Sequence, residues 1–85
     1  MIKIEFDRKN NMSIAYDDNT IVGKCEFINK EDVWNIIHTE VNESYQGQGI
    51  ARKLVEIIIE EAKKNKKKLV ADCSYAMKIL KENKY

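Results

Sequence analysis

The sequence predicts an α+β fold in the order β-β-β-β-α-β-α, with a mixed, mainly antiparallel sheet. Up to residue 41, apolar and polar side chains alternate between short polar turns, which is the period of half-buried strands. From Ile50 onward the apolar residues recur at helical spacing, which indicates an amphipathic helix. A chain of 85 residues predicts a single domain, residues 1–85, with a modest core.

Four strands are expected in the first half of the chain. They span residues 2–6, 12–16, 21–28 and 33–41. The turns between them are short and rich in Asn and Asp, so the strands should form an antiparallel meander. Gly23 interrupts the third strand and indicates a bulge or a close approach of another segment. Trp34 occupies an alternating position of the fourth strand, and we expect it in the core.

Two helices and one short strand are expected in the second half. The long helix starts at Ile50 and ends in the lysine-rich run 63–68, where cations complement the helix C-terminus. Within this run, Asn65 is the candidate for a left-handed cap. Residues 69–71 predict a buried strand, and Ser74 is the candidate N-cap of a closing helix of about two turns.

Composition argues against several classes of partner. The net charge is +1, and the lysine run has no interleaved aromatic residues, so we expect no nucleic-acid partner. No apolar run is long enough for a membrane span, and the N-terminus lacks the apolar stretch of a signal peptide, so we expect a cytoplasmic protein. One histidine and two cysteines at unrelated spacings predict no metal site, and the cysteines are expected to be reduced.

The join between the fourth strand and the long helix carries the main functional signal. The strand ends at Val41, and the run Gln46-Gly47-Gln48-Gly49-Ile50-Ala51 opens the helix. Two glycines let a ligand approach the backbone, and the free N–H groups of a first helical turn attract an anion. Such a loop alone is equally compatible with a glycine-assisted helix entry. A dinucleotide fingerprint would need a third glycine where Arg52 stands, and a Walker loop would need Gly-Lys-Ser/Thr.

Gln46, Gly49 and Ala51 fit the pattern Gln/Arg-x-x-Gly-x-Gly/Ala, and here the sequence resembles the GNAT-type N-acetyltransferases. Within that superfamily it is similar to a miniature single-domain group with a signature cysteine and glycine. The matching segments are His38-Thr39-Glu40-Val41, the glycine loop, Cys73-Ser74-Tyr75 and the closing aromatic Tyr85. Two departures are the Gln at 46 in place of the commoner Arg and the lack of the superfamily's early helices and last strands.

The resemblance implies a minimal GNAT-like fold that binds acetyl-CoA, with coenzyme A as the released product. The residues it implies in binding are Val41, Gln46, Gly47, Gln48, Gly49, Ile50, Ala51 and Arg52. Val41 would line the pantetheine channel, and the loop N–H groups would hold the pyrophosphate. Arg52 or Lys53 would meet the adenosine phosphates, unless these side chains are simply solvated.

Three residues are candidates for catalysis. Cys73 ends a strand just before a helix, where the helix dipole favours a thiolate, so it is a candidate nucleophile; the alternative is a packed core thiol. His38 is the only histidine and a candidate general base. The resemblance implies that Tyr75 protonates the departing coenzyme A thiolate. His38 and Tyr75 each have a structural alternative, a hydrogen-bonded histidine of the strand and an aromatic side chain that packs on a short helix. Cys25 is expected in the core.

These observations predict an N-acetyltransferase acting on an unidentified small-molecule or protein amine, either directly or through Cys73. One alternative is a non-catalytic module that binds coenzyme A or acyl-CoA. Another is a structural or nucleic-acid interaction domain. We expect a monomer or a weak homodimer. A small open fold without an acceptor groove suits a protein lysine or a polyamine as acceptor, or needs a second subunit to complete the site.

Overall fold

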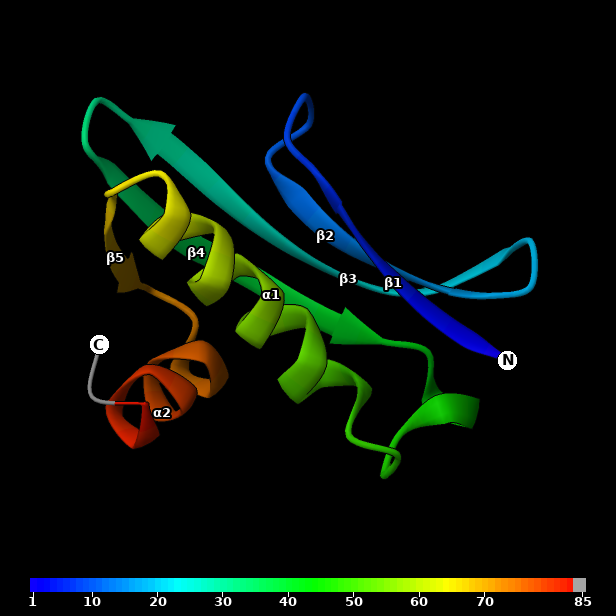
Figure 1. Cartoon of the computed structure of the whole chain (residues 1–85). Helices are drawn as coiled ribbons and strands as arrows, with labels where there is room; N and C mark the ends of the chain where they lie inside the picture. The colour runs from blue at the N-terminus through cyan, green and yellow to red at the C-terminus, as the bar shows by residue number, and fades with distance from the viewer. Residues whose placement is uncertain (84–85) are drawn as a thin grey trace.

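The computed structural model describes residues 1–83 and consists of one five-stranded sheet and two α-helices (Figure 1). The strands are β1 (Ile2–Asp7), β2 (Met12–Asp17), β3 (Thr20–Lys30), β4 (Val33–Val41) and β5 (Lys68–Ala71). The helices are the 3₁₀ turn η1 (Glu43–Tyr45), α1 (Ile50–Lys64) and α2 (Ser74–Glu82). The predicted order is confirmed, with η1 as an addition. Tyr85 lies outside the described residues.

The strands follow one another in the sheet in the order β1-β2-β3-β4-β5. The first four strands pair antiparallel, which confirms the meander. β5 instead pairs parallel to β4, from Val33 opposite Lys68 to Ile36 opposite Ala71. Helix α1 forms the crossover between these two parallel strands, because parallel neighbours cannot be joined by a short turn (Figure 1).

The core lies between the sheet and the helices. Helix α1 contributes one apolar stripe, formed by Ile50, Leu54, Val55, Ile58, Ile59 and Ala62. Trp34 is 1% exposed and stacks on Phe27 at 4.4 Å between ring centroids, which confirms its predicted core position. Cys25 is also fully buried, as expected. Among residues 1–83 no helix is long and apolar enough to cross a membrane.

Gly23 confirms the predicted close approach. A Cβ at this position would lie 3.1 Å from the carbonyl oxygen of Glu40 and 3.3 Å from both Val41 Cγ2 and Leu54 Cδ1. The missing side chain therefore lets β3 pack tightly against β4 and α1. The register between β2 and β3 also shifts close to this glycine.

An irregularity in β4 decides which side chains face the helices. Glu26 pairs with His38 while its neighbour Phe27 pairs with Ile36, so Ile37 is an extra residue in the β4 ladder. Before this bulge, Trp34 and Ile36 point into the core. After it, Thr39 contacts side chains on the core side, and His38 is exposed. One inserted residue thus changes which side chains face the core, from the even-numbered residues before the bulge to the odd-numbered residues after it.

Both helix-end predictions are wrong by one residue. At the end of α1, Asn65 has φ −95° and Lys66 takes the left-handed conformation at φ 55°. Asn65 stays near the helical region because its Nδ2 donates to the Glu61 carbonyl at 2.7 Å. At the start of α2, Cys73 is the N-cap and Ser74 the first helical residue. The Cys73 carbonyl already accepts the first intrahelical hydrogen bond, from the Met77 N–H at 2.9 Å.

Candidate functional site

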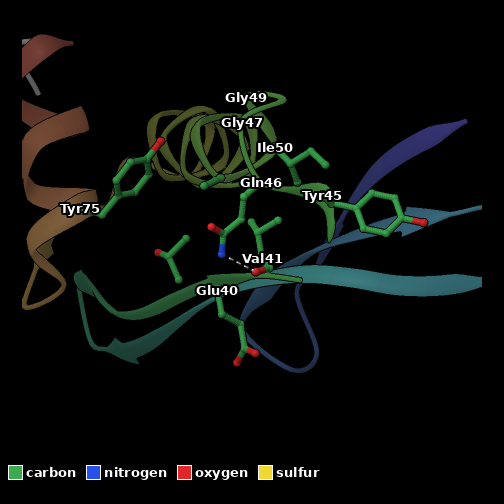
Figure 2. A pocket seen from close by; sticks show the side chains of 10 residues that line it. Glu40, Val41, Tyr45, Gln46, Gly47, Gly49, Ile50 and Tyr75 are labelled. Atoms are coloured by element: carbon green, nitrogen blue, oxygen red, sulfur yellow. Dashed lines mark hydrogen bonds between the residues drawn. The ribbon is translucent and has the colours of Figure 1, made fainter. Parts of the chain in front are cut away.

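A cavity of about 630 Å³ opens where β4, the glycine loop and the start of α2 meet (Figure 2). It is lined by Thr39, Glu40, Val41, Tyr45, Gln46, Gly47, Gly49, Ile50, Ala51 and Tyr75. Tyr75 and Tyr45 stand at its two ends, and Val41 and Gln46 lie between them. Segments far apart in the sequence therefore form one site.

The loop that borders this cavity depends on two glycines with positive φ. Gly47 has φ 84° and Gly49 has φ 78°, values that other L-residues adopt only with strain. A Cβ at either glycine would meet no atom within 4 Å, so the space beside this backbone is open. The backbone is what requires glycine here, and the open space gives a ligand access to the main chain.

The N-terminus of α1 is prepared for an anion. Gly49 is the N-cap and offers no side-chain acceptor, and the first turn holds no acidic residue. The first N–H groups of the helix are therefore left without a side-chain partner, at the positive end of the helix dipole. The Gln46 side chain turns away from them, because its Nε2 donates to the Val41 carbonyl at 3.3 Å (Figure 2). Such an end favours a phosphate or pyrophosphate.

Hydrogen bonds fix the segment that leads into the loop. The Asn42 side chain accepts from the Ser44 N–H at 2.9 Å and caps η1. The Tyr45 hydroxyl donates to Asp17 Oδ2 at 2.6 Å and so ties η1 to the end of β2. The Tyr45 hydrogen bond and the nearby N-terminal ammonium hold the pKa of the Asp17 carboxyl below its usual value. The same bond raises the pKa of Tyr45.

The edge of β4 next to the cavity loses its partner strand midway. Pairing with β5 stops at Ile36 opposite Ala71, and the Asp72 and Cys73 N–H groups then both donate to the Ile36 carbonyl. From there the chain turns into α2, and in residues 1–83 no strand pairs with this edge of β4 beyond Ile36. An unpaired edge offers backbone donors and acceptors to a ligand that contains amides.

Cys73 lies next to the cavity without lining it. Its Sγ is 3.6 Å from Oγ1 of Thr39, which does line the cavity. Burial raises the pKa of the Cys73 thiol, but the Ala76 N–H, the Thr39 hydroxyl and the Tyr75 N–H lower it by more, so the pKa lies below the usual value. The N–H groups belong to the first turn of α2, in line with the predicted effect of a helix N-terminus. In contrast, burial raises the pKa of Cys25 to about 12.

The structure does not bring His38 to the same face of the sheet as Cys73. His38 is exposed, and its Nε2 lies 2.9 Å from Glu40 Oε1. Glu40 points away from the glycine loop in Figure 2, and Lys24 lies 3.8 Å from the same carboxylate. The reason is the bulge at Ile37, which turns the side chains of residues 38 and 40 away from the helices.

The remaining predicted residues divide into two groups. Val41, Gln46, Gly47, Gly49, Ile50, Ala51 and Tyr75 all line the cavity. Gln48 does not line it, and Arg52 is held by α2, where its Nη2 donates to both Glu82 carboxylate oxygens at 3.0 and 3.1 Å. One of the two cations expected to meet adenosine phosphates is thus engaged by a carboxylate. Residues 1–83 contain no cluster of His, Cys, Asp or Glu that could hold a metal ion.

Two residues of the site have no predicted role in the sequence, Thr39 and Tyr45. Thr39 is part of the His-Thr-x-Val segment, but its position between two sulfur atoms depends on the bulge at Ile37. Tyr45 directly precedes the loop, and an aromatic residue at that place is the only sequence signal for it. Its partner Asp17 lies 28 positions earlier and cannot be identified from spacing.

Solved structures with a similar fold include N-acetyltransferases. A GCN5-like protein from Staphylococcus aureus, assigned as an N-acetyltransferase, is 28% identical with a TM-score of 0.71, over 95% of this chain and 79% of that one. The ribosomal-protein-S18-alanine N-acetyltransferase from Escherichia coli is 17% identical with a TM-score of 0.74, over 91% of this chain and 53% of that one. This chain therefore spans about half of the larger enzyme.

A third similar structure contains a ligand. It is the diaminobutyrate acetyltransferase from Paenibacillus lautus in complex with L-2,4-diaminobutyric acid and coenzyme A, 21% identical with a TM-score of 0.53 over 59% of this chain and 32% of that one. Among curated proteins, no sequence matches this chain. The model of one family, GCN5-related N-acetyl-transferase, matches residues 11–85. The chain therefore belongs to the GCN5-related N-acetyltransferase family.

Proposed function

We propose that the protein binds acetyl-CoA in the cavity beside the glycine loop and transfers the acetyl group to an amine. The observation that carries this proposal is the cavity of about 630 Å³, because it joins an uncapped helix N-terminus to the unpaired edge of β4. The first feature suits a pyrophosphate and the second suits the amides of pantetheine. Family membership supports the same ligand.

The residues present fit this ligand. In the proposal, the main-chain N–H groups of residues 47–51 and of Arg52 hold the pyrophosphate. Val41 lies at the unpaired edge, and its carbonyl accepts the long Gln46 contact of 3.3 Å, which a ligand amide can replace. The Arg52 side chain is held by Glu82, so it reaches a phosphate only after leaving this partner.

One route for the acetyl group passes through Cys73. The thiolate sulfur attacks the thioester carbonyl, a new S–C bond forms, and the coenzyme A thiolate leaves with a proton from the Tyr75 hydroxyl. The amine then attacks the acetyl-cysteine and gives a proton back to the Tyr75 phenolate, which yields the amide and returns the Cys73 thiolate. The lowered pKa of Cys73 and the position of Tyr75 at the cavity support this route.

The second route is direct transfer with His38 as general base. Because His38 lies on the far face of β4, the amine would have to approach from the open face of the sheet and reach the thioester past the unpaired edge of β4. The hydrogen bond to Glu40 supports a base role, since a carboxylate orients an imidazole. The acceptor can be a small amine or a protein amine.

Calorimetry with coenzyme A and intact-mass spectrometry with acetyl-CoA test the proposal. We expect saturable binding, and a mass gain of one acetyl group on Cys73 that disappears when an amine is added. In Cys73→Ala the covalent species should be absent. Transfer that survives in Cys73→Ala but falls in His38→Gln would identify the direct route.

Two other results would change the proposal. Binding of acetyl-CoA without transfer to any amine tested, and without acetyl-cysteine, would favour the alternative of a non-catalytic acyl-CoA-binding module. No binding of coenzyme A at millimolar concentration would exclude both functions.

A further inference from the structure

Strand β1 leaves one row of backbone groups without a partner. It forms an edge of the sheet, and within residues 1–83 the strand paired with it is β2 (Figure 1). The Asp18 N–H donates to the Met1 carbonyl at 3.3 Å, so the backbone groups at residue 1 point toward β2. Because these groups alternate along an antiparallel strand, those of Ile2, Ile4 and Phe6 point outward, away from the sheet.

This edge lacks the usual protection against pairing with another strand. Soluble proteins commonly guard an edge strand with a proline, a bulge or a charged side chain that points inward. The chain contains no proline, and the register between β1 and β2 is continuous over all six residues of β1. The side chains of β1 that pack against the core are Ile2, Ile4 and Phe6, which are all apolar. The edge is therefore open to a further strand.

The charged residues of β1 are self-complementary about Ile4. Lys3 and Glu5 have side chains that are 74% and 48% exposed, and Lys3 Nζ lies 3.2 Å from Glu5 Oε2. In an antiparallel pair with Ile4 at the twofold axis, Lys3 of each copy lies opposite Glu5 of the other, which is a favourable cross-strand pair. The same register puts the outward backbone groups of Ile2 opposite those of Phe6, so they can exchange hydrogen bonds. A parallel pair in register would instead place like charges side by side.

An apolar groove lies along the same edge. It has a volume of about 340 Å³ between β1 and α1, and the half-buried side chains of Ile2, Ile4 and Ile57 line it. The charged residues that line it belong to α1 and are Lys53, Glu56 and Glu60. In the antiparallel pair, the Ile4 side chains of the two copies become cross-strand neighbours at this groove, which removes apolar surface from water.

We propose that β1 is a homodimer interface, at which two copies pair antiparallel about a twofold axis at Ile4 and join their five-stranded sheets into one. A second copy is the partner because β1 complements itself both in charge and in the register of its outward backbone groups. The paired strand has six residues in each copy, so the interface is small and the dimer is weak and concentration-dependent. No residue of β1 lines the cavity beside the glycine loop, so the inference does not depend on the proposed function.

Sedimentation equilibrium of the full chain without a tag tests the association. The concentration is varied from about 10 µM to about 1 mM, because mass action shifts a weak dimer over this range. We expect the mean mass to rise from 10.0 kDa toward twice that value and no further, since twofold pairing uses up the β1 edge. A constant monomer mass, or growth beyond the dimer, would overturn the inference.

Charge exchange at the two exposed positions tests the register. In Lys3→Glu and in Glu5→Lys, like charges face each other across the axis, and we expect the dissociation constant of the dimer to rise about tenfold. The double variant Lys3→Glu/Glu5→Lys restores opposite charges and should dimerise like wild type. Lys30→Glu makes the same change of net charge at an exposed residue of β3 and is the matched control. Equal association of Lys3→Glu and Lys30→Glu, or a double variant as weak as the single ones, would contradict the proposed register.

Amide hydrogen exchange measured by NMR locates the interface without any substitution. The N–H groups of Ile4 and Phe6 point outward, so their exchange should slow several-fold as the concentration rises and the dimer forms. The N–H groups of Lys3 and Glu5 already face β2, and their exchange should not depend on concentration. A dimer that forms without slower exchange at Ile4 and Phe6 would use another surface and would overturn the inference.

Discussion

At the scale of single residues, left-handed backbone separates the glycine loop from the ordinary turns. Asn11 and Asp18 close the first two hairpins with φ 54°, and both residue types tolerate this conformation. Gly47 and Gly49 have larger φ values of 84° and 78° in a loop whose backbone faces a cavity. The loop glycines are therefore needed for conformation and for access of a ligand to the main chain.

Replacement of Gly49 by alanine should weaken coenzyme A binding. A left-handed alanine costs roughly 1–2 kcal/mol, and the added Cβ enters the open space beside the loop. We expect the dissociation constant to rise about tenfold, since about 1.4 kcal/mol corresponds to a factor of ten. Calorimetry measures the change. Gln48→Ala, which keeps the backbone N–H of the same loop, is the matched control and should bind like wild type. Equal affinity in Gly49→Ala and Gln48→Ala would contradict a backbone site.

At the scale of single elements, strand β4 shows how one extra residue selects the site. Strict alternation from Trp34 would place His38 on the helix face and Thr39 on the open face. The bulge at Ile37 does the opposite and brings Thr39 to Cys73. A bulge leaves little signal in a sequence, because the extra residue is an ordinary apolar one. The strand itself was predictable from its alternating pattern. Which side chains face the helices after Ile37 was not.

The 3₁₀ turn η1 should depend on its bond to β2. Tyr45→Phe removes the hydroxyl that donates to Asp17, so we expect lower thermal stability and weaker coenzyme A binding. The hydrogen bond lowers the pKa of Asp17, so its stabilisation is present above the unfolded pKa of about 3.9 and is lost as pH falls through the lower folded value. Melting temperatures of both proteins between pH 7 and about pH 2 measure this.

The difference in melting temperature between wild type and Tyr45→Phe should be largest near neutral pH and should shrink below about pH 4. Tyr16→Phe is the control, because Tyr16 is a half-buried tyrosine of β2 and its replacement retains the bond from Tyr45 to Asp17. A constant difference across the whole pH range would mean that the Tyr45 bond to Asp17 does not act in the folded protein.

The C-terminus of α1 offers a stabilising substitution. Lys66 is left-handed at φ 55°, and its N–H donates to the Lys63 carbonyl while the Lys67 N–H donates to the Ala62 carbonyl, which together form a Schellman motif. Lys66→Gly should raise the free energy of unfolding by up to about 1 kcal/mol, because glycine adopts this conformation without strain. Urea denaturation measures the gain. Glu60→Gly, inside the same helix, should instead lose about 1 kcal/mol. A loss in Lys66→Gly would contradict the cap.

At the scale of the whole molecule, the sheet is covered on one face only. The helices bury one side, where Phe6 and Phe27 stack around Trp34. Exposed apolar side chains at Ile28 and Val70, each 48% accessible, lie outside this core. A single core shared by all strands and helices predicts cooperative unfolding, as is usual for a domain of this size.

Urea unfolding should therefore occur in one transition. The fluorescence of Trp34, the only tryptophan, reports the core, and far-UV circular dichroism reports the helices. We expect coincident midpoints with both probes. Ile58→Val, at a fully buried position of α1, should lower both midpoints together by about 0.5–1.5 kcal/mol in stability. Ile21→Val, at a position 58% exposed, is the control and should change stability by less than about 0.5 kcal/mol. Separate midpoints would mean that the helices and the aromatic cluster unfold independently.

The sequence by itself determined the element order, the core position of Trp34, the close approach at Gly23 and the glycine loop, because each depends on local period or on residue type. Only the tertiary structure decided the parity of β4, the partner of Arg52 and the contacts of Thr39 with Cys25 and Cys73. These features join residues up to 34 positions apart, and the strand register that brings them together depends on the packing of the whole sheet against α1 and α2.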